Sequence, residues 1–144
     1  MRLPIMILAL LLACSGPTTV PELGDSYPIP NRSFEMMIAS AQAWPYEEVL
    51  ISGIKYGVAV NKTTGKVAYV STQDSKFKTP EGLSVGATLE QVLATGAEKP
   101  WGEPGWAYHA KLPSGWSAAF IVGRGMTDGP LQPTSKVSWF FKRR

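Results

Sequence analysis

The chain contains one cysteine, Cys14, so no disulfide can form within it. Its fold must therefore be held together mainly by the burial of apolar side chains. Cys14 ends a short apolar segment in which Leu3 to Ala13 carry no charge and Arg2 supplies a positive charge before them. The segment is shorter than the roughly 20 apolar residues that a transmembrane helix needs. Its length and flanks are typical of a signal peptide.

The run Leu11-Leu12-Ala13-Cys14 resembles the lipobox of bacterial lipoproteins. The resemblance implies a diacylglycerol group on the thiol of Cys14, cleavage between Ala13 and Cys14, and removal of residues 1–13. Two or more acyl chains would then anchor the protein stably, because each buried methylene contributes about 0.8 kcal/mol. Two alternatives stay open: an ordinary secretory signal with an incidental Cys14, and a buried N-terminal strand.

The rest of the chain divides into a linker and one domain. Residues 14–32 are rich in proline and small polar residues, and we expect them to form an extended tether behind the lipid. Residues 33–144 show no internal repeat and are expected to form a single domain. The chain is 44% apolar and 17% charged, which is ordinary for a globular protein.

Two helices are predicted. The first covers 33–44, with Ser33 as N-cap and Pro45 ending it. Its apolar residues recur at helical spacing: Phe34, Met37, Ile38 and Ala41. The second helix begins at Thr88, which has capping-box spacing to Gln91, and ends before Gly96. Its expected buried side consists of Leu89, Val92 and Leu93.

The remaining periodic segments are predicted strands. Residues 54–61 and 66–72 alternate and flank a polar turn with Gly65, which indicates a hairpin. A second hairpin is expected from 106–112 and 116–122, and further strands from 136–142 and, more briefly, 49–52. The predicted fold class is α+β: a mainly antiparallel twisted sheet of about five strands with one or two helices packed on a face.

The pattern Gly86-x-Thr88-x-x-Gln91-Val92, followed by Gly96 and Trp106-x-Tyr108, resembles the small lipoprotein of the outer-membrane β-barrel assembly machinery. This resemblance, which covers 86–108, implies a compact α+β domain that contacts other subunits of an envelope machine. The chain departs from that family because a hairpin at 54–72 precedes the Thr88 helix. No binding residues are inferred from this resemblance. Gly86, Thr88 and Gly96 also fit a simpler role, in which they only mark the start and the end of a helix.

The sequence contains few residues in patterns typical of a catalytic site. His109 is the only histidine, and a hydrolase could pair it with Ser114, Ser117 or Ser138, yet no Gly-x-Ser-x-Gly motif occurs. The carboxylates are scattered, so we expect neither a metal nor a cofactor. A formal net charge of +3, without a basic stripe, argues against nucleic acid as a partner.

Aromatic and basic residues near the C-terminus are the candidate partner contacts. They are Trp101, Phe140, Arg143 and Arg144. Most aromatics must build the core, but Phe140 breaks the alternation of its strand, and Trp101 lies in a Pro/Gly-rich loop. The basic residues could also be a solvated chain end.

The expected function is that of a non-catalytic lipoprotein that binds an envelope protein or polymer, with the membrane contacted through acyl chains on Cys14. Ser15 after the cysteine favours the outer over the inner membrane, with the domain facing the periplasm or the cell exterior. One alternative is an inhibitor or immunity lipoprotein that blocks a cell-wall hydrolase or toxin with loops 73–82 or 123–135. A second alternative is a small hydrolase that uses His109.

Overall fold

The computed structural model describes residues 16–30 and 34–144, so Ala13 and Cys14 lie outside the described residues. The fold is nearly all-β, and the α+β prediction is wrong. Within these residues the structure has eight antiparallel strands and one helix of six residues. The elements are β1 (Glu35–Ala39), β2 (Gln42–Ile51), β3 (Ile54–Asn61), β4 (Lys66–Thr72), α1 (Leu89–Ala94), β5 (Trp101–Glu103), β6 (Ala107–Lys111), β7 (Ser117–Phe120) and β8 (Trp139–Arg143).

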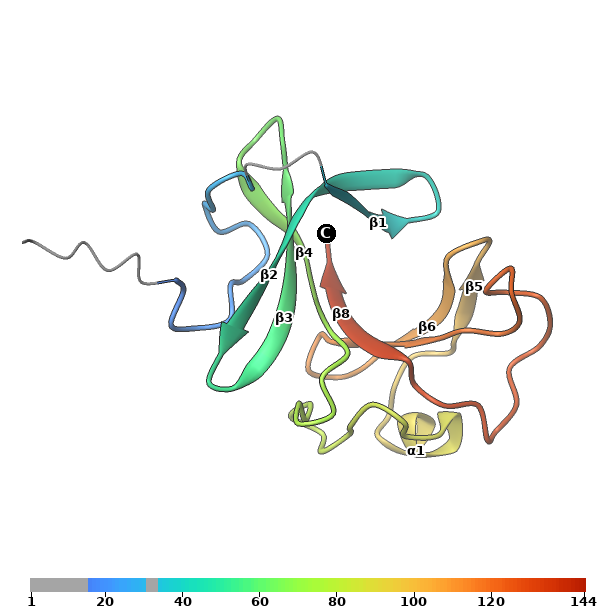
Figure 1. Ribbon diagram of the computed structural model, residues 1–144. Helices are drawn as coiled ribbons and strands as arrows, with labels where there is room; N and C mark the ends of the chain where they lie inside the picture. The colour runs from blue at the N-terminus through green and yellow to red at the C-terminus, as the bar shows by residue number, and fades with distance from the viewer. Residues whose placement is uncertain (1–15, 31–33) are drawn as a thin grey trace, which may run out of the picture.

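The strands form one sheet in the order β1-β2-β3-β4-β8-β7-β6-β5. The sheet curls into a half-barrel, and β1 folds back over its inner face (Figure 1). Side chains of β5 and β8 join the edge formed by β1 to the other half of the sheet. Arg143 of β8 donates to the carbonyl oxygen of Ile38 at 2.8 Å, and Glu103 of β5 accepts from the backbone N–H of Ser40 at 3.0 Å. The two edges are therefore bridged by side chains rather than by a ladder.

Alternation along the strands produces two cores, one on each face. The larger, outer core contains Val58, Val70 and Phe140 and is covered by α1 and the loops around Phe77. The smaller, inner core lies within the curl. Its buried members are Ile38, Tyr46, Ala59, Tyr69, Trp106, Ala107, Ala119 and Phe141.

The helix predicted at 33–44 is wrong, because this segment forms β1, a turn at Ser40-Ala41 and the start of β2. Phe34 and Met37 are exposed, whereas Ile38 is buried. Four apolar residues in a short run fit either period, so the pattern alone could not separate helix from strand. Pro45 lies opposite Glu35 at the end of the β1–β2 pairing and just before β2 begins to pair with β3 at Tyr46, so its missing N–H is tolerated.

Several local predictions are confirmed. The hairpins β3–β4 and β6–β7 form with the expected antiparallel pairing. Thr88 caps α1 through a reciprocal capping box with Gln91, and Gly96 follows the helix with a positive φ of 87°. Leu93, however, was expected to be buried and is 42% exposed. Of the three residues expected on the buried side, this helix buries Leu89 and Val92.

Part of the predicted tether contacts the sheet. Within the described residues 16–30, the N–H of Gly24 donates to the carbonyl oxygen of Val67, and Val67 donates back to Asp25, both at 2.9 Å. The side chains of Val20, Leu23 and Tyr27 pack against the outer core. The boundary at residue 33 between tether and domain stays a prediction.

Candidate functional site

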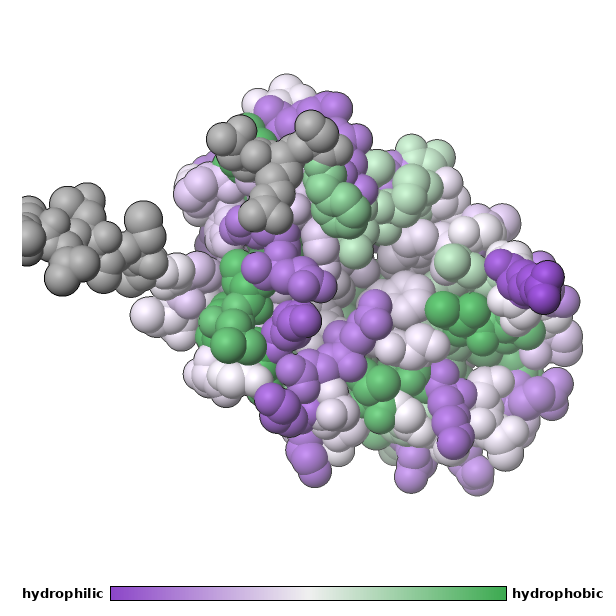
Figure 2. Space-filling model, in the orientation of Figure 1, coloured by the Kyte–Doolittle hydropathy of each residue, from purple (hydrophilic) through white to green (hydrophobic). Residues whose placement is uncertain are grey.

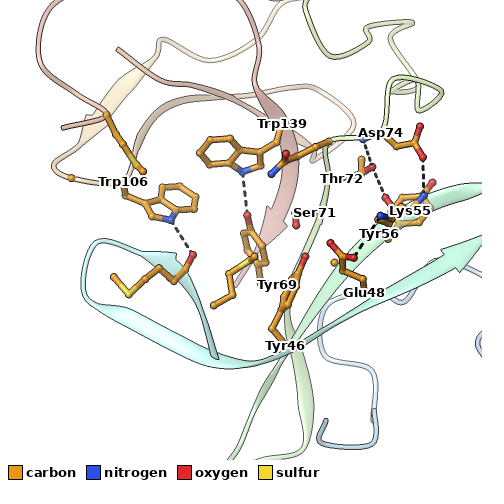
Figure 3. A pocket seen from close by; sticks show the side chains of 16 residues that line it. Tyr46, Glu48, Lys55, Tyr56, Tyr69, Ser71, Thr72, Asp74, Trp106 and Trp139 are labelled. Carbon is orange, nitrogen blue, oxygen red and sulfur yellow. Dashed lines mark hydrogen bonds and ion pairs between the residues drawn. The ribbon is translucent and has the colours of Figure 1, made fainter. Parts of the chain in front are cut away.

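A cavity of about 600 Å³ opens on the inner face of the half-barrel and is the candidate site (Figure 3). Most of its lining comes from β1 to β4, β8 and the chain around residues 105 and 126. The lining residues are Met36, Met37, Tyr46, Glu48, Lys55, Tyr56, Gly57, Tyr69, Ser71, Thr72, Gln73, Asp74, Gly105, Trp106, Met126 and Trp139. A volume of this size is in the range that accommodates small ligands.

The alternation of side chains along the strands determines which residues form the floor of the cavity. Tyr46 of β2 and Tyr69 of β4 both point inward, and Ser71 lies next along β4 on the same face (Figure 3). Position 57, on β3 between them, is a glycine, and the Tyr46 ring occupies the space that a side chain there would need. The floor is thus shaped by an aromatic ring that lies directly against backbone.

The polar groups around the floor are bonded within the protein. The indole N–H of Trp139 donates to the Tyr69 hydroxyl at 3.1 Å, and that of Trp106 donates to the carbonyl oxygen of Met37 at 3.2 Å. The Thr72 hydroxyl donates to the carbonyl oxygen of Lys55 at 2.8 Å. Among the described residues, every buried side-chain nitrogen or oxygen has a hydrogen-bond partner.

Both floor tyrosines remain protonated at neutral pH. Burial raises the pKa of Tyr69 far above its ordinary value, although hydrogen bonds with Ser71 and Trp139 act in the opposite direction. Burial, and then the nearby carboxylate of Glu48, raises the pKa of Tyr46. The phenols are therefore neutral, and the floor carries no charge of its own.

One end of the cavity is apolar and rich in methionine. Met37 is 49% exposed beside Trp106, which bonds its carbonyl oxygen. Met126 is 39% exposed on the loop opposite, which a hydrogen bond from the N–H of Gly105 to the Thr127 hydroxyl holds near Trp106. Thioether side chains are unbranched and adapt to irregular apolar ligands.

The other end of the cavity is charged. Figure 3 shows Glu48, Lys55 and Asp74 there, across the floor from Trp106. The ammonium of Lys55 lies 3.7 Å from the Glu48 carboxylate, and its backbone N–H donates to Asp74 at 3.0 Å. Backbone hydrogen bonds from Lys55 and Lys76 lower the pKa of Asp74, so its carboxylate is ionised at neutral pH.

His109, the candidate base of a hydrolase, is buried in an ionic cluster. Its Nε2 lies 3.2 Å from the Glu103 carboxylate, which also binds Arg143 at 3.0 Å. Burial lowers the pKa of His109, and the Arg143 charge adds to this, while Glu103 opposes it. Burial would raise the pKa of Glu103, but hydrogen bonds from Ser40 and Arg143 outweigh it and lower the pKa.

The serines proposed beside His109 are only partly brought to it. A second cavity of about 430 Å³ is lined by His109, Ser114 and Ser117, among others. Ser114, however, donates to Glu81 from both its N–H and its hydroxyl, at 2.7 and 3.0 Å. Within the described chain, no hydrogen bond joins His109 to a serine.

The four predicted partner contacts have different environments. Trp101 is 53% exposed at the free edge of β5, with its ring centroid 4.3 Å from that of His109. Phe140 is fully buried in the outer core, so its selection as a surface contact is corrected. Arg143 is held over the Trp106 ring and in the Glu103 pair, and Arg144 is exposed beside Gly24.

Sequence reasoning missed the cavity itself. The floor residues Tyr69 and Ser71 lie in the strand predicted at 66–72, but Tyr46 lies in β2, whose first residues fall within the helix predicted at 33–44. The usable signal is Gly57 itself, because a glycine inside a predicted strand marks a place where another group can lie close to the backbone.

The described part of the chain shows neither a cluster of metal ligands nor a helix that could span a membrane. In residues 16–30 and 34–144, no three His, Cys, Asp or Glu side chains converge as metal ligands would. No helix in the same part of the chain is both long and apolar enough to cross a bilayer.

Comparison with known proteins gives a likeness to a solved structure. No family model matches the chain, and no curated protein matches its sequence. The crystal structure of the uncharacterized protein yfeY from Escherichia coli is similar with a TM-score of 0.44 and 17% sequence identity. The likeness covers 87% of this chain and 95% of that one.

Proposed function

We propose that this protein is a lipid-anchored envelope protein whose half-barrel binds another envelope component through its inner cavity, without catalysing a reaction. The observation that carries this proposal is the open cavity, which has an apolar end, a charged end and a floor whose fully buried polar groups are bonded internally. Such a lining is suited to binding by shape and apolar contact.

The anchor in this proposal is the acylated thiol of Cys14, within the lipobox Leu11 to Cys14. The connection between this anchor and the domain would be short, because Val20, six residues after Cys14, packs on the outer core. Six residues of extended chain span at most about 20 Å. A domain anchored in this way would stay close to the membrane, on the outer membrane rather than the inner one if Ser15 acts as the sorting signal.

The surface favours a local site over a broad docking face. On the side of the molecule shown in Figure 2, apolar residues form small separate patches among polar ones. A cavity is then the more specific recognition feature. The buried position of His109, with its Nε2 at Glu103, argues for a structural role of this residue.

An inhibitor or immunity protein is the second candidate function. The loop at 123–129 supports it, because Met126 is an exposed non-glycine residue with a φ of 67°. Strained, exposed loop residues are often functional. The loop 73–82 is less suited to insertion into an enzyme, since Phe77 anchors it in the outer core against Trp116.

The test has two parts. Metabolic labelling with a fatty-acid analogue should mark the wild-type chain and leave Cys14→Ala unlabelled. Capture from envelope extract should then recover a partner with the wild type and with Leu93→Asp, an exposed position outside the cavity, but not with Met37→Asp. Absence of label, or equal recovery with Met37→Asp, would contradict the proposal. A single tightly bound enzyme would favour the inhibitor.

A further inference from the structure

We infer that the inner cavity binds a single-chain amphiphile, with its hydrocarbon tail at the methionine end and an uncharged or zwitterionic head at the Lys55 end. This inference rests on the proposed function, since it names the chemistry of the group that the same cavity would accept. It follows from three properties: which polar atoms are free, how charge is distributed, and how the open end is built.

The floor favours a hydrocarbon over a polar group. The indole nitrogens of Trp106 and Trp139 are both committed to partners within the protein, as is the Thr72 hydroxyl. A peptide or sugar lying against these three groups would bury polar groups of its own that they cannot meet. An unpaired buried polar group is destabilising, whereas a hydrocarbon tail has none to satisfy.

The charged end favours a head without net negative charge. Glu48 and Lys55 form an ion pair there, and Asp74 adds a second carboxylate whose pKa is held low by backbone hydrogen bonds. Lys76 lies close enough to Asp74 to lower that pKa further. Positive and negative groups are therefore balanced, and an anionic head would meet two carboxylates with no unpaired cation in the lining.

The apolar end permits entry and variation in tail length. Met37 and Met126 are both exposed and line the same cavity as Trp106, so a tail can contact all three without displacing a buried side chain. Methionine adapts its rotamers to the ligand at low cost. The cavity volume of about 600 Å³ suits one chain better than a two-chain lipid.

The experiment titrates dodecylphosphocholine, below its micelle concentration, into the full chain carrying Cys14→Ala, so that no acyl group of its own competes. Calorimetry should show saturable binding at one site. Decylphosphocholine should bind about tenfold more weakly, because two buried methylenes contribute about 0.8 kcal/mol each. Met37→Asp should weaken binding at least tenfold, and Leu93→Asp should leave it unchanged. Dodecanoate, with the same chain and an anionic head, should bind more weakly than dodecylphosphocholine.

Binding without saturation, equal affinity for the two chain lengths, or equal affinity of Met37→Asp and Leu93→Asp would each overturn the inference. Tighter binding of dodecanoate would overturn the assignment of the head. The proposed function fails separately: if an envelope partner is still captured through position 37 while dodecylphosphocholine does not bind, only the amphiphile is refuted. Such a result would point to a protein side chain as the occupant.

Discussion

The Tyr46 ring lies against Gly57 across the β2–β3 pair, so closely that any side chain at position 57 would overlap its phenol group. Both residues are buried on the inner face, and both line the cavity. The shape of the floor therefore depends on the absence of a Cβ atom at one position.

Gly57→Ala is expected to destabilise the protein by about 1–3 kcal/mol, as overpacking of a close-packed site does. It should also weaken ligand binding, since Tyr46 must move. Denaturant unfolding monitored by tryptophan fluorescence measures the first effect. Gly16→Ala is the matched control, because a Cβ there meets open space. Equal unfolding midpoints for the two variants would show that Tyr46 is not fixed by Gly57.

The pair Glu103–Arg143 closes the half-barrel, since both residues also bond the β1 end of the sheet. Glu103→Ala removes the carboxylate that Arg143, His109 and the N–H of Ser40 share, and should cost about 3 kcal/mol of unfolding free energy. The exposed pair Glu35–Lys62 provides the control, and Glu35→Ala should change stability by less than about 1 kcal/mol. Similar losses in both variants would mean that the closure contributes little.

His109 should make the protein less stable as the pH falls from neutral. Burial lowers its pKa in the folded chain, while the unfolded chain titrates near about 6.5. Below that pH the unfolded state binds a proton that the folded state does not, so the free energy of unfolding decreases by up to about 1.4 kcal/mol per pH unit. Glu103 acts at lower pH, because its depressed pKa removes stability only as carboxylates protonate.

His109→Gln should therefore flatten the dependence of unfolding free energy on pH between about 7 and 5.5. Urea melts at several pH values measure it. The assignment is direct because the chain has one histidine. An unchanged slope in His109→Gln would show that the folded and unfolded pKa values of His109 are the same.

Local signals predicted local structure well. The turn residues around Gly65 and Gly115 predicted both central hairpins. The spacing of Thr88 and Gln91 predicted a capping box, and the two residues form its reciprocal hydrogen bonds. These features depend on residues close in sequence, so a single chain contains all the information needed.

Long-range features were not accessible in the same way. The run Phe34 to Ala41 became a strand because β2 and the inner core were available to pair with it and bury Ile38, and no local residue encodes that partner. The cavity likewise depends on β1 meeting Trp106, just before β6, and Arg143 of β8 across the curl. Phe140 illustrates the same limit, since a sheet covered on both faces buries residues of either parity.

Photocrosslinking in living cells tests most directly whether an anchored domain binds through its cavity. A photoreactive amino acid is placed at Met37, at the open end of the cavity, or at Leu93 on α1 as the control. We predict a discrete adduct from position 37, none from position 93, and loss of the adduct when Cys14→Ala removes the anchor. Adducts of equal yield from both positions, or an adduct that persists undiminished in Cys14→Ala, would contradict this view of the protein.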